Sequence, residues 1–336
     1  MEFVESFYKV ISSEAEKIIK SCRTKVAVRR RETRYISTIR TKTAMARSSA
    51  KPKGKLKSLI RKHKAGHAIR VVQGKDGLNS ELREAVRKKD AEKTRRILSR
   101  GADANLKDAE LLHSSVVKGQ SEITEELLMG GAEVDARNCA DRTPLHNACW
   151  KGHFGIARNL VDFGADVNAT DNYFTTPIME AAKFGHMSIV NFLMLEHADI
   201  DISDKWGATA LMKAAYKGHI DIVECLIANG ADIHKKDLGG EDAFLIACRL
   251  GNTEIIEMLF ANGADKNSKN KDKTTGLMLA SSAGHFETVK LLLRSRINID
   301  AVSECGWTAM DYAEIGGHFG VMELLMKFGG RKGVAF

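Results

Sequence analysis

The chain has 336 residues, of which 43% are hydrophobic and 28% are charged, and it carries a formal net charge of +9. With 3 prolines and 6 cysteines, this composition excludes collagen-like, proline-rich and disulfide-scaffold proteins. No run approaches the roughly 20 apolar residues of a membrane-spanning helix. The first residues lack the features of a secretory signal and the cysteines form no CxxC pair, so we expect a reduced, cytoplasmic or nuclear protein.

Residues 1–22 place apolar side chains such as Phe3, Phe7, Ile11 and Ile18 at helical spacing, which predicts an amphipathic helix. Its four glutamates argue against a mitochondrial presequence, because such presequences are poor in acidic residues. An isolated helix of this length is marginal in water, so its apolar stripe is expected to pack on another surface. That surface could belong to the chain itself, to a second copy or to a foreign groove.

A basic arm follows over residues 23–75, where 18 Lys and Arg residues face one acid, Glu32. Like charges at this density oppose compaction, so we expect the arm to be largely disordered. Three interpretations stay open: a nuclear-import signal, a site for nucleic acid or acidic lipid, and a solvated tail. Because Tyr35 is its sole aromatic residue, the arm would contact phosphates rather than read bases. The clustered basic residues are Arg29, Arg30, Arg31, Lys51, Lys53, Lys55, Lys57, Arg61, Lys62 and Lys64.

The remainder, 76–336, is mildly acidic and contains a repeat of 33 residues. Two independent series of glycines share this period, and histidine follows most members of the first series. A period of this size indicates a solenoid of small stacked units. The first series is Gly119, Gly152, Gly185, Gly218, Gly251, Gly284 and Gly317, and the second is Gly131, Gly164, Gly230, Gly263 and Gly329.

Within one repeat, the pattern predicts two short helices. A helix over 143–150 begins with Thr-Pro, which suits a capped start, and ends before Gly152. A second helix carries Ile156 and Leu160 at helical spacing and ends before Gly164, where a left-handed cap is needed.

The segments Thr143-Pro144-Leu145-His146, Gly152-His153 and Gly164-Ala165-Asp166-Val167-Asn168 closely resemble the ankyrin repeat. The resemblance implies an all-α solenoid of stacked helix-turn-helix repeats with β-hairpin-like fingers over 76–336. We expect an N-terminal capping repeat at 76–108, six repeats at 109–303 and a C-terminal capping repeat at 304–336. The pattern departs from the family at two finger turns, where Asp141 and Phe174 replace glycine, and at Asp311 and Tyr312 in the last repeat.

In this family, a concave groove is lined by the fingertips and the exposed side of each first helix. Placed on this sequence, the groove positions are Arg142, Trp150, Lys151, Tyr173, Lys183, Phe184, Lys205, Trp206, Tyr216, Lys217, Arg249 and Trp307. All three tryptophans fall in this set, and exposed aromatics beside cations are typical of binding hot spots. We therefore expect aromatic residues at the centre of a site that favours an acidic, apolar-studded protein segment. The alternatives are ordinary exposed aromatics or a packed row of fingertips.

The sequence gives little support for metal binding or catalysis. One histidine per repeat cannot converge on a shared zinc ion, and Cys149 and Cys248 occupy small inward positions of first helices. No nucleotide-binding or hydrolase motif is present, so we expect no enzyme activity, cofactor or metal. The family resemblance also makes Asn168, eight residues after Leu160, a possible substrate of an asparaginyl hydroxylase; the alternative is an asparagine that simply suits its turn.

The sequence as a whole predicts a non-enzymatic intracellular adaptor or scaffold that binds a protein in its groove. The alternative is a nuclear regulator whose basic arm contacts nucleic acid or acidic lipid while the repeats recruit protein. A third class, a receptor that delivers substrates to a separate catalyst, also stays open.

Overall fold

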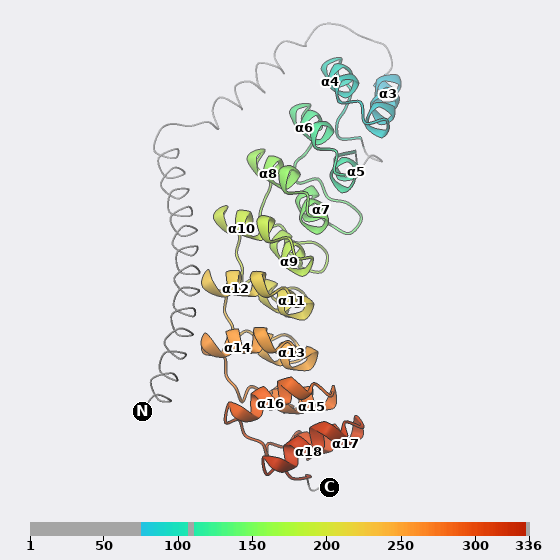
Figure 1. Ribbon diagram of the computed structural model, residues 1–336. Helices are drawn as coiled ribbons and strands as arrows, with labels where there is room; N and C mark the ends of the chain where they lie inside the picture. Colours follow the sequence, from blue (N-terminus) through green and yellow to red (C-terminus); the bar gives the residue numbers. More distant parts are fainter. Residues whose placement is uncertain (1–74, 107–110, 334–336) are drawn as a thin grey trace, which may run out of the picture. The chain divides into compact units, whose positions relative to one another are not determined.

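The computed structural model describes residues 75–106 and 111–333 (Figure 1). The predicted helix at 1–22 and all ten clustered bases of the arm lie outside these residues. In the described part, the regular structure is helical apart from one isolated antiparallel bridge between Lys269 and Thr275. This confirms the predicted all-α repeat fold. No described helix combines the length and the apolarity needed to cross a bilayer.

The described helices form eight antiparallel pairs that stack in chain order (Figure 1). Each first helix contacts the first helix of the next pair, and second helices contact second helices in the same way. The pairs are α3 (Lys75–Arg87) and α4 (Ala91–Ser99), α5 (Leu111–Val117) and α6 (Ser121–Met129), α7 (Pro144–Lys151) and α8 (Phe154–Asp162), α9 (Pro177–Lys183) and α10 (Met187–Leu195), α11 (Ala210–Lys217) and α12 (Ile220–Ala228), α13 (Ala243–Leu250) and α14 (Thr253–Ala261), α15 (Gly276–Ser282) and α16 (Phe286–Arg294), and α17 (Ala309–Ile315) and α18 (Phe319–Lys327).

The first helices begin and end where the sequence predicts. Thr143 is the N-cap of α7 with Pro144 in the first turn, and Gly152 closes the helix in a left-handed conformation with φ of 76°. Leu145, Ala148 and Cys149 point inward and are fully buried. Each repeat therefore buries the apolar face of its neighbour, which a single helix pair could not do alone.

A glycine and an imidazole join neighbouring repeats. The Nε2 of His186 donates to the backbone carbonyl of Trp150 at 3.1 Å, and its ring covers Gly152 so closely that a Cβ there would lie 2.5 Å from Cε1. The same bond recurs from His219 to Lys183 at 3.2 Å. The turn glycine is thus required twice, by its positive φ and by the histidine of the next repeat.

The loops between repeats end in tight turns, which we call the fingertips. In the third fingertip-forming loop, the Asp171 carboxylate accepts the backbone N–H groups of Tyr173 and Thr175 at 2.8 and 2.9 Å. Phe174 and Asp141 adopt positive φ of 56° and 58°, the conformation in which glycine occurs at later fingertips. Both residues therefore adopt a left-handed, strained conformation at the turn position where the repeat pattern predicts glycine.

The last repeat differs from the inner ones in its polar residues. Glu314 occupies the position of the fully buried Cys149 and is exposed, and Lys332 pairs with it at 2.6 Å. Asp311 accepts the backbone N–H groups of Thr308 and Gly333 at 2.8 and 2.7 Å. Residues 331–333 thus cover part of the surface on which a further repeat would stack.

The glycine–histidine joint can be tested with two matched substitutions. Gly185→Ala should lower the free energy of unfolding by about 1 kcal/mol more than Gly218→Ala, because both impose left-handed strain but only the first also creates a close contact. The added methyl would lie 2.8 Å from His219 Cε1 at position 185 but 3.7 Å from the Asn252 side chain at position 218. Denaturant unfolding monitored by circular dichroism measures both variants, and equal losses would show that the imidazole contact is unimportant.

Candidate protein-binding surface

Two groups of aromatic side chains form where fingertips and first-helix ends meet solvent. At the fingertips, the rings of Tyr173 and Trp206 are stacked, with centroids 5.5 Å apart and an interplanar angle of 13°. Their exposed fractions are 44% and 52%, although the two residues cover each other. The stack exists because the two residues hold equivalent fingertip positions in consecutive repeats.

The second group lies at the ends of first helices α7 and α9. The ring of Trp150 meets that of Phe184 edge to face, with centroids 6.3 Å apart, and Phe184 is 40% exposed. One repeat further on, Tyr216 is 54% exposed at the end of α11. These rings do not belong to the buried core, and exposed apolar side chains that cluster on one face are typical of interaction sites.

Lysines lie against these rings. The Nζ atoms of Lys151 and Lys205 are 3.8 and 3.9 Å from the centroids of Trp150 and Tyr173, at cation–π distance. Lys183 and Lys217 approach Phe184 and Tyr216 at 5.3 and 5.4 Å. None of the four forms an ion pair with a described carboxylate. We call the following residues the aromatic–lysine surface: Trp150, Lys151, Tyr173, Lys183, Phe184, Lys205, Trp206, Tyr216 and Lys217.

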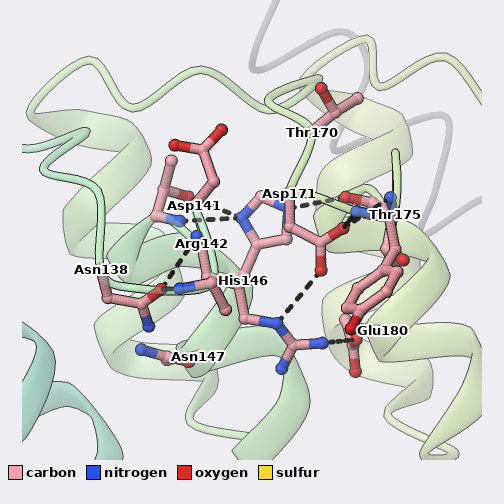
Figure 2. A network of polar contacts seen from close by, with 12 residues as sticks. Asn138, Asp141, Arg142, His146, Asn147, Thr170, Asp171, Thr175 and Glu180 are labelled. Atoms are coloured by element: carbon pink, nitrogen blue, oxygen red, sulfur yellow. Dashed lines mark hydrogen bonds and ion pairs between the residues drawn. The ribbon is translucent and has the colours of Figure 1, made fainter.

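Arg142, one of the predicted groove residues, is held in ion pairs within the solenoid. Its guanidinium donates from Nε to Asp171 at 3.1 Å and from Nη2 to Glu180 at 2.5 Å (Figure 2). Both carboxylates are buried, and Arg142 itself is only 25% exposed. It therefore links its own fingertip to the next repeat instead of standing free for a partner.

The acid–base character of this buried network is set by burial and by hydrogen bonds. Burial lowers the pKa of His146 to about 4, although its Nε2 donates to the Thr175 carbonyl at 2.8 Å. Burial alone would raise the pKa of Asp171, but the backbone N–H groups of Thr175 and Tyr173 and the Arg142 charge together lower it. Near neutral pH, the network therefore holds a neutral imidazole beside a charged ion-pair cluster.

Two other predicted groove residues also lie apart from the aromatic–lysine surface. Arg249 pairs with Glu241 of its own repeat. Trp307 is half-buried and packs edge to face on Tyr312, with centroids 5.7 Å apart. Their use in binding stays a prediction, and no described contact joins them to the aromatic groups.

Sequence reasoning missed two exposed apolar residues beside the stacked pair. Phe174 is 57% exposed, and the repeat pattern identifies it only as a turn residue. Leu238 is 62% exposed and donates its backbone N–H to the Trp206 carbonyl at 2.7 Å. The signal was available, because Leu238 holds the fingertip position one repeat after Lys205.

Asn168 and the buried cysteines have structural surroundings. The Oδ1 of Asn168 accepts the backbone N–H of Asp199 at 2.8 Å, so its side chain joins two repeats, and its hydroxylation stays a prediction. Burial raises the pKa of the Cys149 and Cys248 thiols, which opposes formation of a reactive thiolate. Among the described residues, no group of three potential ligands could hold a metal ion.

Comparison with known families agrees with this architecture. A family profile described as ankyrin repeats (3 copies) matches residues 82–171, 178–270 and 244–334, and a profile described as ankyrin repeats (many copies) matches residues 156–194. No curated protein matches the chain.

The buried ion-pair cluster should be far more sensitive than a surface pair. Arg142→Ala leaves the carboxylates of Asp171 and Glu180 without their cation, so we expect a loss of about 3 kcal/mol in the free energy of unfolding. Arg158→Ala is the control, because its ion pair with Asp162 is exposed and worth less than about 0.5 kcal/mol. Similar losses in the two variants, measured by urea unfolding, would contradict the structural role of Arg142.

The neutral state of His146 predicts a specific pH dependence. In the unfolded chain this imidazole binds a proton near pH 6.5, whereas the native pKa is about 4, so stability is full above pH 6.5 and is lost as the pH falls toward 4. At pH 5 the titration of His146 alone should lower the free energy of unfolding by about 2 kcal/mol relative to its value at neutral pH.

His146→Met tests that dependence, because methionine fills the equivalent position in three later repeats. The variant should lose less stability than the wild type between pH 7.5 and pH 5. An unchanged difference between the two pH values, in denaturant titrations of both proteins, would show that His146 does not carry the effect.

Proposed function

Because the chain belongs to the ankyrin repeat family, we propose that it is a non-enzymatic adaptor or scaffold that binds a protein partner on the aromatic–lysine surface. Ankyrin repeats are generally protein–protein interaction modules, and the family is typically non-enzymatic. Family membership supplies the class of function but not the place of binding. The exposed side chains of the chain itself indicate the place of binding.

The observation that carries the proposal is the exposure of large aromatic rings on consecutive repeats. Tyr173, Phe184, Trp206 and Tyr216 are each at least 40% exposed and lie on two consecutive fingertips and two consecutive first-helix ends. Rigid aromatic side chains bury much area at low entropic cost, and they dominate the energetics of protein interfaces. In a compact globular protein, aromatic rings of this size would lie mostly in the core.

The charges on this surface favour an acidic partner. Lys151, Lys183, Lys205 and Lys217 have no described carboxylate partner, whereas the cations beneath them are neutralised, as in the pair between Lys213 and Asp204 at 2.6 Å. A partner that brings carboxylates would gain ion pairs without breaking existing ones. Such complementarity mainly raises the association rate and excludes wrong partners.

The basic arm at 23–75 supports a second element of the proposal. Its 18 Lys and Arg residues suit an import signal or a polyanion contact, so the arm would direct the bound complex to the nucleus or to an acidic surface. The cytoplasm, the nucleus or both are the proposed locations.

Alanine substitution of the stacked pair tests the proposed site. A Tyr173→Ala, Trp206→Ala double variant should lose at least about tenfold in partner recovery, because truncating each anchor residue commonly costs about 2 kcal/mol. Phe319→Ala is the matched control, since Phe319 is 77% exposed in α18, outside the aromatic–lysine surface.

Affinity purification with quantitative mass spectrometry compares the two variants with the full-length wild type, after circular dichroism has shown that both are folded. Unchanged recovery of every partner by the double variant would remove this surface as the binding site.

A further inference from the structure

We infer that the aromatic–lysine surface receives an amphipathic α-helix with carboxylates on both sides of its apolar stripe. This inference rests on the proposed function and adds the conformation and charge pattern of the partner segment. It follows from the state of the fingertip backbone, from the repeat spacing and from the order of the side chains on α7, α9 and α11.

The backbone groups of the Tyr173 and Trp206 fingertips are already hydrogen-bonded within the solenoid, so few are free to pair with a partner strand. The N–H of Lys205 donates to the Tyr173 carbonyl at 2.9 Å, and the N–H of Leu238 donates to the Trp206 carbonyl at 2.7 Å. The N–H groups of Tyr173 and Trp206 are taken by the side chains of Asp171 and Asp204, at 2.8 and 2.9 Å. Addition of a strand needs a row of unpaired backbone groups, and these fingertips use theirs in bonding one another.

A partner must therefore bind through side chains, and this favours a helix. An extended segment pressed onto the rings of Tyr173, Trp206 and Phe184 would bury its own N–H and C=O groups without partners, at a cost of about 1–3 kcal/mol each. An α-helix satisfies these groups internally and presents side chains alone. The aromatic rings can then contact an apolar stripe without desolvating backbone.

The spacing of the repeats matches that of a helix lying along the stack. Consecutive first helices α7, α9 and α11 pack against one another, and packed helices are about 8–10 Å apart. A helix rises about 10.5 Å in seven residues, so side chains at i, i+7 and i+14 would meet three consecutive repeats. The partner segment is therefore about 15 residues long, or four turns.

The order of side chains at the ends of the first helices sets the charge pattern. In α7 the aromatic residue precedes the lysine, as Trp150-Lys151; after α9 the order reverses, as Lys183-Phe184; and α11 returns to Tyr216-Lys217. Each of the two neighbouring positions at the helix ends therefore holds both aromatic residues and lysines: Trp150, Lys183 and Tyr216 share one position, and Lys151, Phe184 and Lys217 share the other. A helix lying along these two positions meets cations in both of them, so carboxylates on one flank alone would reach only part of the lysines.

A displayed peptide library tests this inference without a known partner. Yeast-displayed random 18-residue peptides are selected on the full-length protein, and the dissociation constants of enriched peptides are measured. We expect apolar residues at i, i+3 or i+4 and i+7, with Asp or Glu on both flanks. Proline at the centre of such a peptide should weaken binding at least about tenfold, because it breaks the helix, whereas a helix-bracing side-chain staple on the outer face should not weaken it.

Two parallel measurements separate this inference from the proposed function. Every enriched peptide is also measured on a Phe184→Ala, Tyr216→Ala double variant, which removes two rings of the helix-end row, and on the Phe319→Ala control. Peptides that lose binding to the double variant, but tolerate central proline and lack helical spacing, would overturn the helical partner and leave the surface in place. Peptides that bind both variants equally, or a selection that yields no binder, would contradict both proposals.

Discussion

The contact between one repeat and the next controls the rest of this structure. A histidine ring covers the turn glycine of the preceding repeat and donates to its backbone, as His186 does to Trp150 at 3.1 Å. Fingertip hydrogen bonds, such as that from Lys205 to Tyr173 at 2.9 Å, add a second link between repeats at the opposite end of the first helix. Together these bonds fix the spacing and rotation of neighbouring repeats, which apolar packing alone would leave less defined.

A fixed spacing turns residues far apart in the sequence into one surface. Tyr173 and Trp206 are stacked because they hold the same position in successive repeats, and Trp150 meets Phe184 for a closely related reason. The polar network beneath uses the same principle, since Arg142 joins carboxylates of the next repeat. Charges below the surface are thereby neutralised within the solenoid, while the lysines above it remain available for a partner.

The sequence was sufficient to predict the repeat fold and the positions at which exposed aromatic residues occur. Periodic glycines and the Thr-Pro start predicted the helix pairs, since these residues act locally through φ and capping. The hydrogen-bond partners of individual side chains were harder to predict, because Arg142 bonds residues 29 and 38 positions away in the next repeat. Periodicity places such a residue in a row of backbone positions, but the direction of its side chain depends on which carboxylates the neighbouring repeat provides. The contact of Trp307 with Tyr312 was likewise not predictable from periodicity, because it depends on the side chain that the last repeat provides.

Trp206 lies in solvent on a surface of positive charge, and fluorescence quenching measures both its exposure and the local charge. A Trp150→Phe, Trp307→Phe variant retains Trp206 as its sole tryptophan. Because Lys205 Nζ lies 4.7 Å from the Trp206 ring centroid, the anion iodide should quench the emission strongly and the cation caesium only weakly. Lys205→Gln removes this charge and should reduce the difference in quenching between the two ions. Emission that iodide does not quench, or equal quenching by the two ions, would contradict this account of the surface.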